Sequence, residues 1–99
     1  MWNSQINKMA DMIVEYKVMP NTDVEVEYEQ LEKVVKECVE NYQSDVVVKE
    51  CGPEPLGFGM QAVKIKFQMD ENHGTDNIED QLSELEEVGE LQCTLMDRL

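Results

Sequence analysis

Hydrophobic and polar residues alternate along two stretches of the chain, as they do in strands that bury one face. The first stretch runs from Met12 to Val18 and the second from Gly57 to Met69. Their apolar positions are Met12, Val14, Tyr16, Val18, Val63, Ile65, Phe67 and Met69. The polar residues between them, among them Lys64 and Lys66, are expected on the opposite face of the sheet.

Two shorter segments predict two further strands. Ser44–Cys51 contains consecutive valines, and β-branched residues favour strands. Near the end of the chain, Leu91, Cys93 and Leu95 alternate with polar residues. The segment Gly52–Pro55, which is rich in turn-forming residues, predicts a loop between the second and third strands.

Two other segments have apolar residues at spacings of three and four, which is the period of a helix. The first runs from about Val24 to Asn41, with Asp23 as its expected N-cap. The second runs from about Asp76 to Val88, and Gly89 is expected to end it. The apolar stripes are Val24, Tyr28, Leu31, Val34, Val35, Cys38, Val39 and Tyr42 in the first, and Ile78, Leu82, Leu85 and Val88 in the second.

The resulting order of elements, β-α-β-β-α-β, predicts an α+β fold of the ferredoxin-like type. This is a sandwich in which two helices cover one face of a four-stranded antiparallel sheet. The other face is expected to be open and mildly basic, because Lys17, Lys49, Lys64 and Lys66 fall on strands. Residues 1–8 are expected to be a flexible leader, and residues 9–99 a single domain.

Charge and composition narrow the classes of partner. The chain has 99 residues, is 41% hydrophobic and carries a net charge of −14. That charge disfavours direct binding to nucleic acid and favours a basic protein surface, unless it serves only solubility. No apolar run is long enough to span a membrane, and the N-terminus is unlike a signal peptide, so a cytoplasmic protein is expected.

The residues do not form a recognisable catalytic or metal site, so neither an enzyme nor a cofactor is expected. The cysteines Cys38, Cys51 and Cys93 are far apart and His73 has none near it, which argues against zinc. Cysteines of this kind are usually small, buried apolar residues. An RNA-binding module of this fold needs aromatic residues on the open face, where Tyr16 and Phe67 are not expected.

Two features are candidates for binding a partner. In Pro55-Leu56-Gly57-Phe58-Gly59, the two glycines leave the ring of Phe58 unshielded, and exposed aromatic residues make good interface anchors. The alternative is that Phe58 folds onto its own core. The second feature is the segment Asp97-Arg98-Leu99, expected to leave the sheet as a short tail. It is either a frayed end or a cation aimed from a fixed exit point.

Together, Val18-Met19-Pro20, Leu56-Gly57-Phe58-Gly59-Met60, Gly74-Thr75-Asp76 and Arg98-Leu99 resemble the archaeal translation elongation factor 1-beta family. They are also similar to the C-terminal exchange domain of the eukaryotic counterpart. The resemblance covers about residues 9–99. It implies a guanine nucleotide exchange factor for elongation factor 1-alpha, the GTPase that delivers aminoacyl-tRNA to the ribosome.

The resemblance also implies roles for particular residues. In the eukaryotic family, the phenylalanine of the Gly-Phe-Gly segment docks on the second domain of the GTPase, which here implies Gly57, Phe58 and Gly59. The basic penultimate residue reaches the magnesium and phosphate region, which here implies Arg98, followed by Leu99. That residue is usually lysine in the eukaryotic family, and arginine differs from it in reach and geometry.

The open sheet face is expected to face the partner, near the start of the third strand and the C-terminus. Lys64 and Lys66 would contribute to binding there, and the free protein is expected to be monomeric. Two rival functions remain open on the sequence. One is a ligand-sensing regulatory domain that dimerises through its sheet, and the other is a structural interaction module without exchange activity.

Overall fold

A computed structural model describes residues 11–71 and 74–98 of the chain. The predicted leader, His73 and Leu99 lie outside the described residues, so the expectations for them stay predictions. The elements, in chain order, are β1 (Asp11–Pro20), α2 (Tyr28–Glu40), β2 (Val47–Gly57), β3 (Met60–Asp70), α3 (Asp76–Ser83) and β4 (Val88–Arg98).

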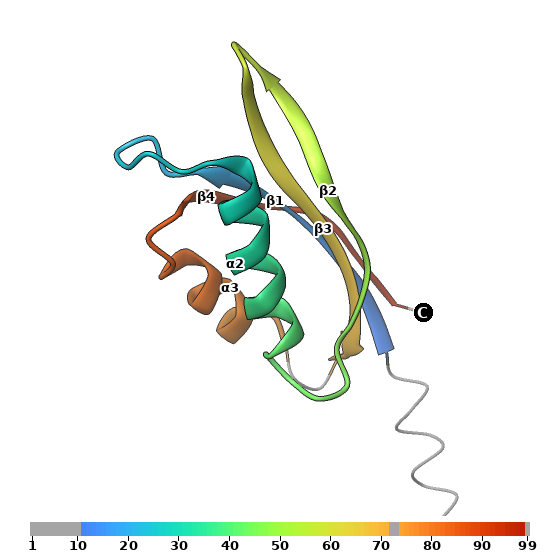
Figure 1. Ribbon diagram of the computed structural model, residues 1–99. Helices are drawn as coiled ribbons and strands as arrows, with labels where there is room; N and C mark the ends of the chain where they lie inside the picture. Colours follow the sequence, from blue (N-terminus) through green and yellow to red (C-terminus); the bar gives the residue numbers. More distant parts are fainter. Residues whose placement is uncertain (1–10, 72–73, 99) are drawn as a thin grey trace, which may run out of the picture.

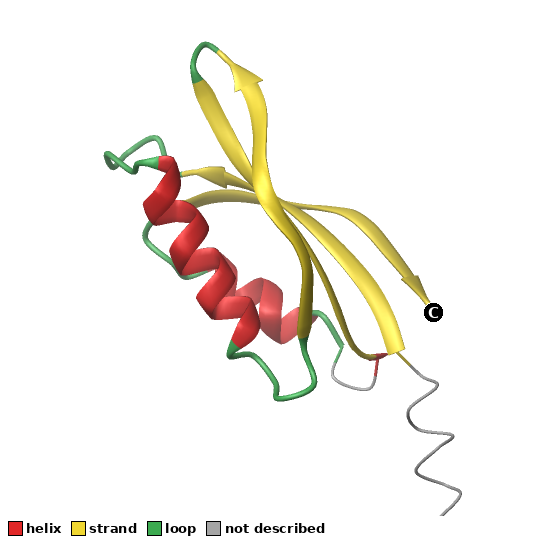
Figure 2. Cartoon of the chain, turned by 45° about the vertical axis from the view of Figure 1, so that its right-hand side comes forward, coloured by secondary structure: helices red, strands yellow, loops and turns green. Residues whose placement is uncertain are grey.

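The predicted ferredoxin-like fold is confirmed. The strands form an antiparallel sheet in the order β2-β3-β1-β4. Both helices lie on one face of this sheet, and the β2–β3 hairpin projects beyond them (Figures 1 and 2). Among the described residues, neither helix is long and apolar enough to cross a membrane.

The core lies between the helices and the two central strands, β1 and β3. The predicted inward residues of both strands are buried, and Leu31, Val35 and Val39 of α2 pack against them. Tyr16 is fully buried, and its hydroxyl donates a 2.8 Å hydrogen bond to Glu79 Oε2 of α3. Burial, followed by the Glu79 carboxylate, raises the pKa of Tyr16. The phenol therefore stays neutral and ties β1 to α3.

The first helix begins later than the sequence pattern predicts, at Tyr28 instead of Val24. Asp23 is not its N-cap, because the backbone N–H of Asp23 donates to Asn21 Oδ1 (2.9 Å) in a local turn. Asn21 in turn bonds the segment before β4, through the carbonyl oxygens of residues 86 and 87. These contacts hold the chain after β1 against the segment before β4, and the helix begins only at Tyr28.

The predicted loop Gly52–Pro55 is wrong, because these residues continue β2 up to Gly57. β2 is an edge strand that pairs only with β3. Prolines are tolerated at an edge, where a missing N–H removes no bond from the sheet. The hairpin therefore turns at Phe58 and Gly59, further along the chain than predicted.

The second helix and the last strand also differ from the prediction. α3 ends at Ser83, and Val88 and Gly89 belong to β4, so that Gly89 does not cap the helix. β4 continues through Arg98, which pairs with Met12. The expected tail is therefore part of the sheet, at least as far as Arg98.

Gly89 is required for a close approach of two strands. A Cβ added to Gly89 would lie 2.6 Å from Pro20 O and 2.9 Å from Asn21 Cα. Because both neighbours are backbone atoms, the strands must shift to make room. We expect Gly89→Ala to lower the free energy of unfolding by about 1–3 kcal/mol, the usual cost of overpacking.

Denaturant unfolding of the purified protein measures this change. Gly52→Ala is the matched control, because a Cβ there meets no atom within 4 Å. Equal stability of the two variants would show that the β1–β4 contact tolerates a methyl group.

Candidate functional site

The tip of the β2–β3 hairpin presents Phe58 to solvent. Gly57 pairs with Met60, so that Phe58 and Gly59 form a two-residue turn. Phe58 is 104% exposed relative to a free residue. Of the two alternatives left by the sequence, packing onto its own core is therefore wrong, and the ring lies clear of the domain.

The backbone of this turn is unusual for an aromatic residue. The φ angles are 92° at Gly57, 55° at Phe58 and 77° at Gly59. Positive φ at both central residues is the geometry of hairpin turns that favour Asn-Gly. A residue with a Cβ in this left-handed region is destabilised by about 1–2 kcal/mol. Strained residues of this kind cluster at functional sites.

A shallow groove lies beside the hairpin tip, between β3 and the chain leading into α2. Its volume is about 460 Å³. Met60, which is 40% exposed, borders it next to Gly59. Val24 and Val26 also line it, although the sequence pattern placed Val24 in a helix. The alternation Val24-Glu25-Val26-Glu27 was a signal against a helix here, but the helical spacing obscured it.

Arg98 lies at the end of β4, close to the end of β3. Its Nε is 2.8 Å from Oε2 of Glu71, and the arginine side chain is 81% exposed. Its backbone N–H donates to Asp97 Oδ1 at 2.9 Å. A depression of about 420 Å³ adjoins it, also bordered by Gly74 and Thr75. Sequence reasoning missed Glu71, because no local pattern links it to the end of the chain.

The structure places the two candidate features at opposite ends of the sheet. β3 runs from Met60, beside the hairpin tip, to Asp70, and β4 brings Arg98 to that far end. Eleven strand residues span about 33 Å at 3.3 Å per residue. The start of the third strand and the C-terminus, both expected near the partner-facing surface, therefore lie far apart, because antiparallel pairing carries them to opposite ends.

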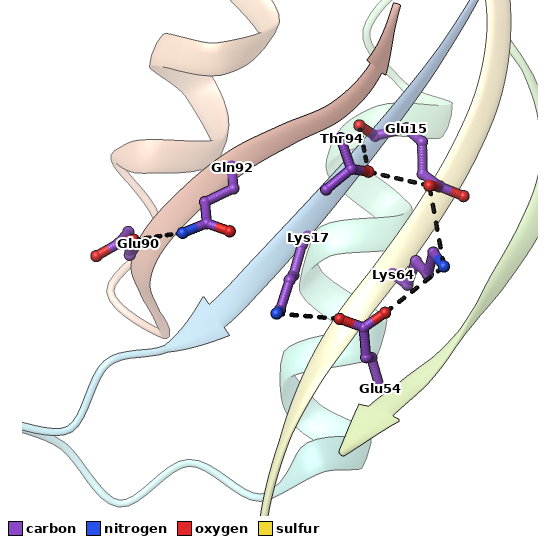
Figure 3. Close-up of polar contacts among 7 residues, drawn as sticks. All are labelled: Glu15, Lys17, Glu54, Lys64, Glu90, Gln92 and Thr94. Carbon is purple, nitrogen blue, oxygen red and sulfur yellow. Dashed lines mark hydrogen bonds and ion pairs between the residues drawn. The ribbon is translucent and has the colours of Figure 1, made fainter. Parts of the chain in front are cut away.

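The open face of the sheet is not basic, contrary to expectation. Figure 3 shows Lys17 and Lys64 on either side of Glu54, with Lys17 Nζ 3.0 Å and Lys64 Nζ 3.5 Å from its carboxylate oxygens. Lys64 Nζ is also 4.0 Å from Glu15. The adjacent Lys17 ammonium holds the pKa of Glu54 below its ordinary value. These strand lysines are therefore neutralised within the sheet.

Lys66 is paired in the same way, with its Nζ 3.9 Å from Glu50 Oε1. We expect the double variant Lys64→Glu, Lys66→Glu to lose up to about 1 kcal/mol of stability, because each change sets like charges side by side. Thermal unfolding at low and high salt measures it, and added salt should reduce the loss. Lys49→Glu is the control, since Lys49 is an exposed lysine of the same sheet outside these pairs. A salt-independent loss would contradict this electrostatic cause.

The cysteines show no sign of a metal site in residues 11–71 and 74–98, where no group of three or more His, Cys, Asp or Glu side chains is arranged to hold a metal. Cys38 and Cys51 are half-buried, whereas Cys93 is exposed, contrary to the expectation of buried cysteines. Cys93 lies on β4, an edge strand of the sheet. Burial, with help from Glu32, raises the pKa of Cys51 to about 11.

Both candidate features lie within the part of the chain that matches a known protein family. The family described as the EF-1 guanine nucleotide exchange domain matches residues 13–99. The chain is 38% identical over 81 residues to elongation factor 1-beta of Methanocaldococcus jannaschii, covering 81% of this chain and 88% of the relative. It is 42% identical to elongation factor 1-beta of Methanococcus maripaludis strain C5, with the same coverage.

A more distant archaeal relative matches a longer part of the chain. The elongation factor 1-beta of Caldivirga maquilingensis is 32% identical over 93 residues, which is 92% of this chain and 98% of the relative. The likeness therefore extends over both ends of the sheet.

Proposed function

The chain belongs to the elongation factor 1-beta family, and on that premise we propose that it is a guanine nucleotide exchange factor. In this proposal it promotes the release of GDP from elongation factor 1-alpha, so that GTP can bind. Its place of action is then the cytoplasm, where that GTPase serves protein synthesis. The reaction makes and breaks no covalent bond, so the protein acts by binding and not as an enzyme.

The observation that best supports this proposal is the exposure of Phe58 on a strained turn. A ring held clear of the domain, by a backbone that disfavours it, has no folding role. Strands β2 and β3 pair on both sides of the turn, as far as Gly57 and Met60, so the sheet positions the ring. An aromatic residue presented in this way loses little conformational freedom when a pocket of the GTPase receives it.

The separation of Phe58 and Arg98 suits a factor that contacts two parts of a partner. We infer that Phe58 anchors the domain while Arg98 reaches the nucleotide site. A permanent cation brought near Mg²⁺ repels the metal, and the loss of the metal leaves the diphosphate unscreened. The factor thereby binds the nucleotide-free GTPase better than the nucleotide-bound form. Each tenfold weakening of GDP needs about 1.4 kcal/mol of this difference.

Release of a fluorescent GDP analogue from elongation factor 1-alpha tests the proposal. The factor should accelerate release in a concentration-dependent and saturable manner. A rate that does not change at any concentration would refute exchange activity and leave a structural interaction module. The molecular mass of the free protein in solution tests the alternative of a ligand-sensing regulatory domain, because that alternative requires a stable homodimer formed through the sheet.

A further inference from the structure

Arg98 reaches its position through a β-bulge in β4. Tyr16 of β1 lies opposite Cys93, whereas Glu15 lies opposite Leu95, so that Thr94 has no residue opposite it. The Thr94 hydroxyl lies 3.2 Å from the backbone O of Glu15 and 3.0 Å from its Oε1 (Figure 3). A shift of one residue moves every following side chain to the other face of the sheet.

This shift decides the face on which Arg98 lies. In the observed register Arg98 pairs with Met12, which is on the helix-covered face. A continuous ladder would place Asp97 opposite Met12 and would turn Arg98 to the open face. Leu95 shows the same reversal, since it shares the open face with Glu15 instead of the helix-covered face with Cys93. The bulge therefore brings Arg98 to the side where Glu71 lies.

Glu71 is the carboxylate that contacts this guanidinium. Its Oε2 contacts Nε of Arg98 at 2.8 Å, and Glu71 is 27% exposed against 81% for the arginine. This contact is made at Nε, whereas the two terminal amino groups form the outer fork of the side chain. Such a fork is well suited to a phosphate or carboxylate. The more buried carboxylate therefore acts as a fixed support for the more exposed cation.

We propose that Glu71 is a positioning residue that holds Arg98, on the face set by the bulge at Thr94, ready to meet an anionic group of the GTPase. This inference rests on the proposed exchange function. A side chain that is already oriented loses less freedom on binding. An exposed ion pair changes an equilibrium by at most about five-fold, which bounds the expected effect.

GDP release at saturating factor tests this role. We expect Glu71→Ala to slow release by up to about five-fold, the upper limit for an exposed ion pair. Glu71→Gln should retain most of the rate, because its amide oxygen still accepts from Nε. Glu71→Ala combined with Arg98→Ala should be no slower than Arg98→Ala alone, since Glu71 acts through Arg98. Glu40→Ala, at an exposed acid of α2, is the control for the change in net charge.

The orientation itself can be measured in the free protein. Arg98 is the only arginine of the chain, so its Nε–H gives one unambiguous NMR signal. The ¹⁵N–¹H heteronuclear NOE of that signal should fall in Glu71→Ala and not in Glu40→Ala. An unchanged NOE, or an equal slowing by Glu71→Ala with and without Arg98, overturns the positioning role. If Arg98→Ala itself releases GDP at the full rate, the proposed function of Arg98 falls as well.

Discussion

Replacing Phe58 with alanine is expected to weaken binding to elongation factor 1-alpha by about 2 kcal/mol or more, as the loss of a buried aromatic anchor does. The ring touches no part of its own core, because it is fully exposed at the hairpin tip. Thermal stability should therefore change little. A Phe58 that supported the core would instead lose about 3–5 kcal/mol of fold stability on truncation. A binding titration and a thermal melt on the same variant separate the two effects.

The strained turn makes a sharper version of this test possible. Phe58→Asn should raise the melting temperature, because Asn-Gly is the preferred pair for a turn with positive φ at both positions. The gain should be about 1 kcal/mol, the strain that a left-handed residue stores. The same variant should lose the docking contact. Phe58→Tyr is the matched control, since it keeps the aromatic ring and should retain most of the affinity.

A protein that becomes more stable as it loses its partner would identify the turn as a site kept for binding. If Phe58→Asn binds normally, the aromatic ring is not the anchor. If it melts at a lower temperature, the φ of 55° at Phe58 is not a source of strain.

Removing the charge of Arg98 is expected to impair exchange much more than binding. Arg98→Ala should still bind elongation factor 1-alpha through Phe58, yet accelerate GDP release at least about tenfold less than the unmodified protein. A tenfold effect corresponds to about 1.4 kcal/mol of differential binding. The fold should be little affected, because the side chain is 81% exposed and its ion pair lies at the surface.

Nucleotide release at saturating factor measures this effect, because saturation removes differences in affinity. Arg98→Lys should restore much of the rate, since it keeps the positive charge. Recovery should be incomplete, because lysine has no planar fork for Glu71 to orient. Full activity of Arg98→Ala would contradict the role of the cation, and would leave remodelling of the GTPase by the docked hairpin as the cause of exchange.

The sequence alone determined the central strands, the order of the elements and the family. The inward residues of β1 and β3 were all identified, because a strand buried on one face shows its period within a few neighbouring residues. The Gly57-Phe58-Gly59 segment also stood out locally. Neighbouring residues could not show whether Phe58 is exposed or packed, because its exposure depends on how far the hairpin extends beyond the helices.

Tertiary structure decided the edges of the sheet and the surroundings of Arg98. Pro53 and Pro55 break a strand in most contexts, and only an edge position without a neighbour tolerates them. Thr94 has no residue opposite it, and each side chain of β4 after it therefore lies on the other face of the sheet. The alternation of Leu91, Cys93 and Leu95 predicts no such reversal.

The ion pairs of the charged side chains were also decided by the tertiary structure. Lys64 looked like part of a basic face until pairing brought Glu15 and Glu54 beside it. Likewise, Glu71 meets Arg98 only because β1 pairs with both β3 and β4 and brings their ends together. Alternation along a strand is a local property and can be read from neighbours in sequence. The partner of a side chain depends on strand order and register, which only the folded sheet decides.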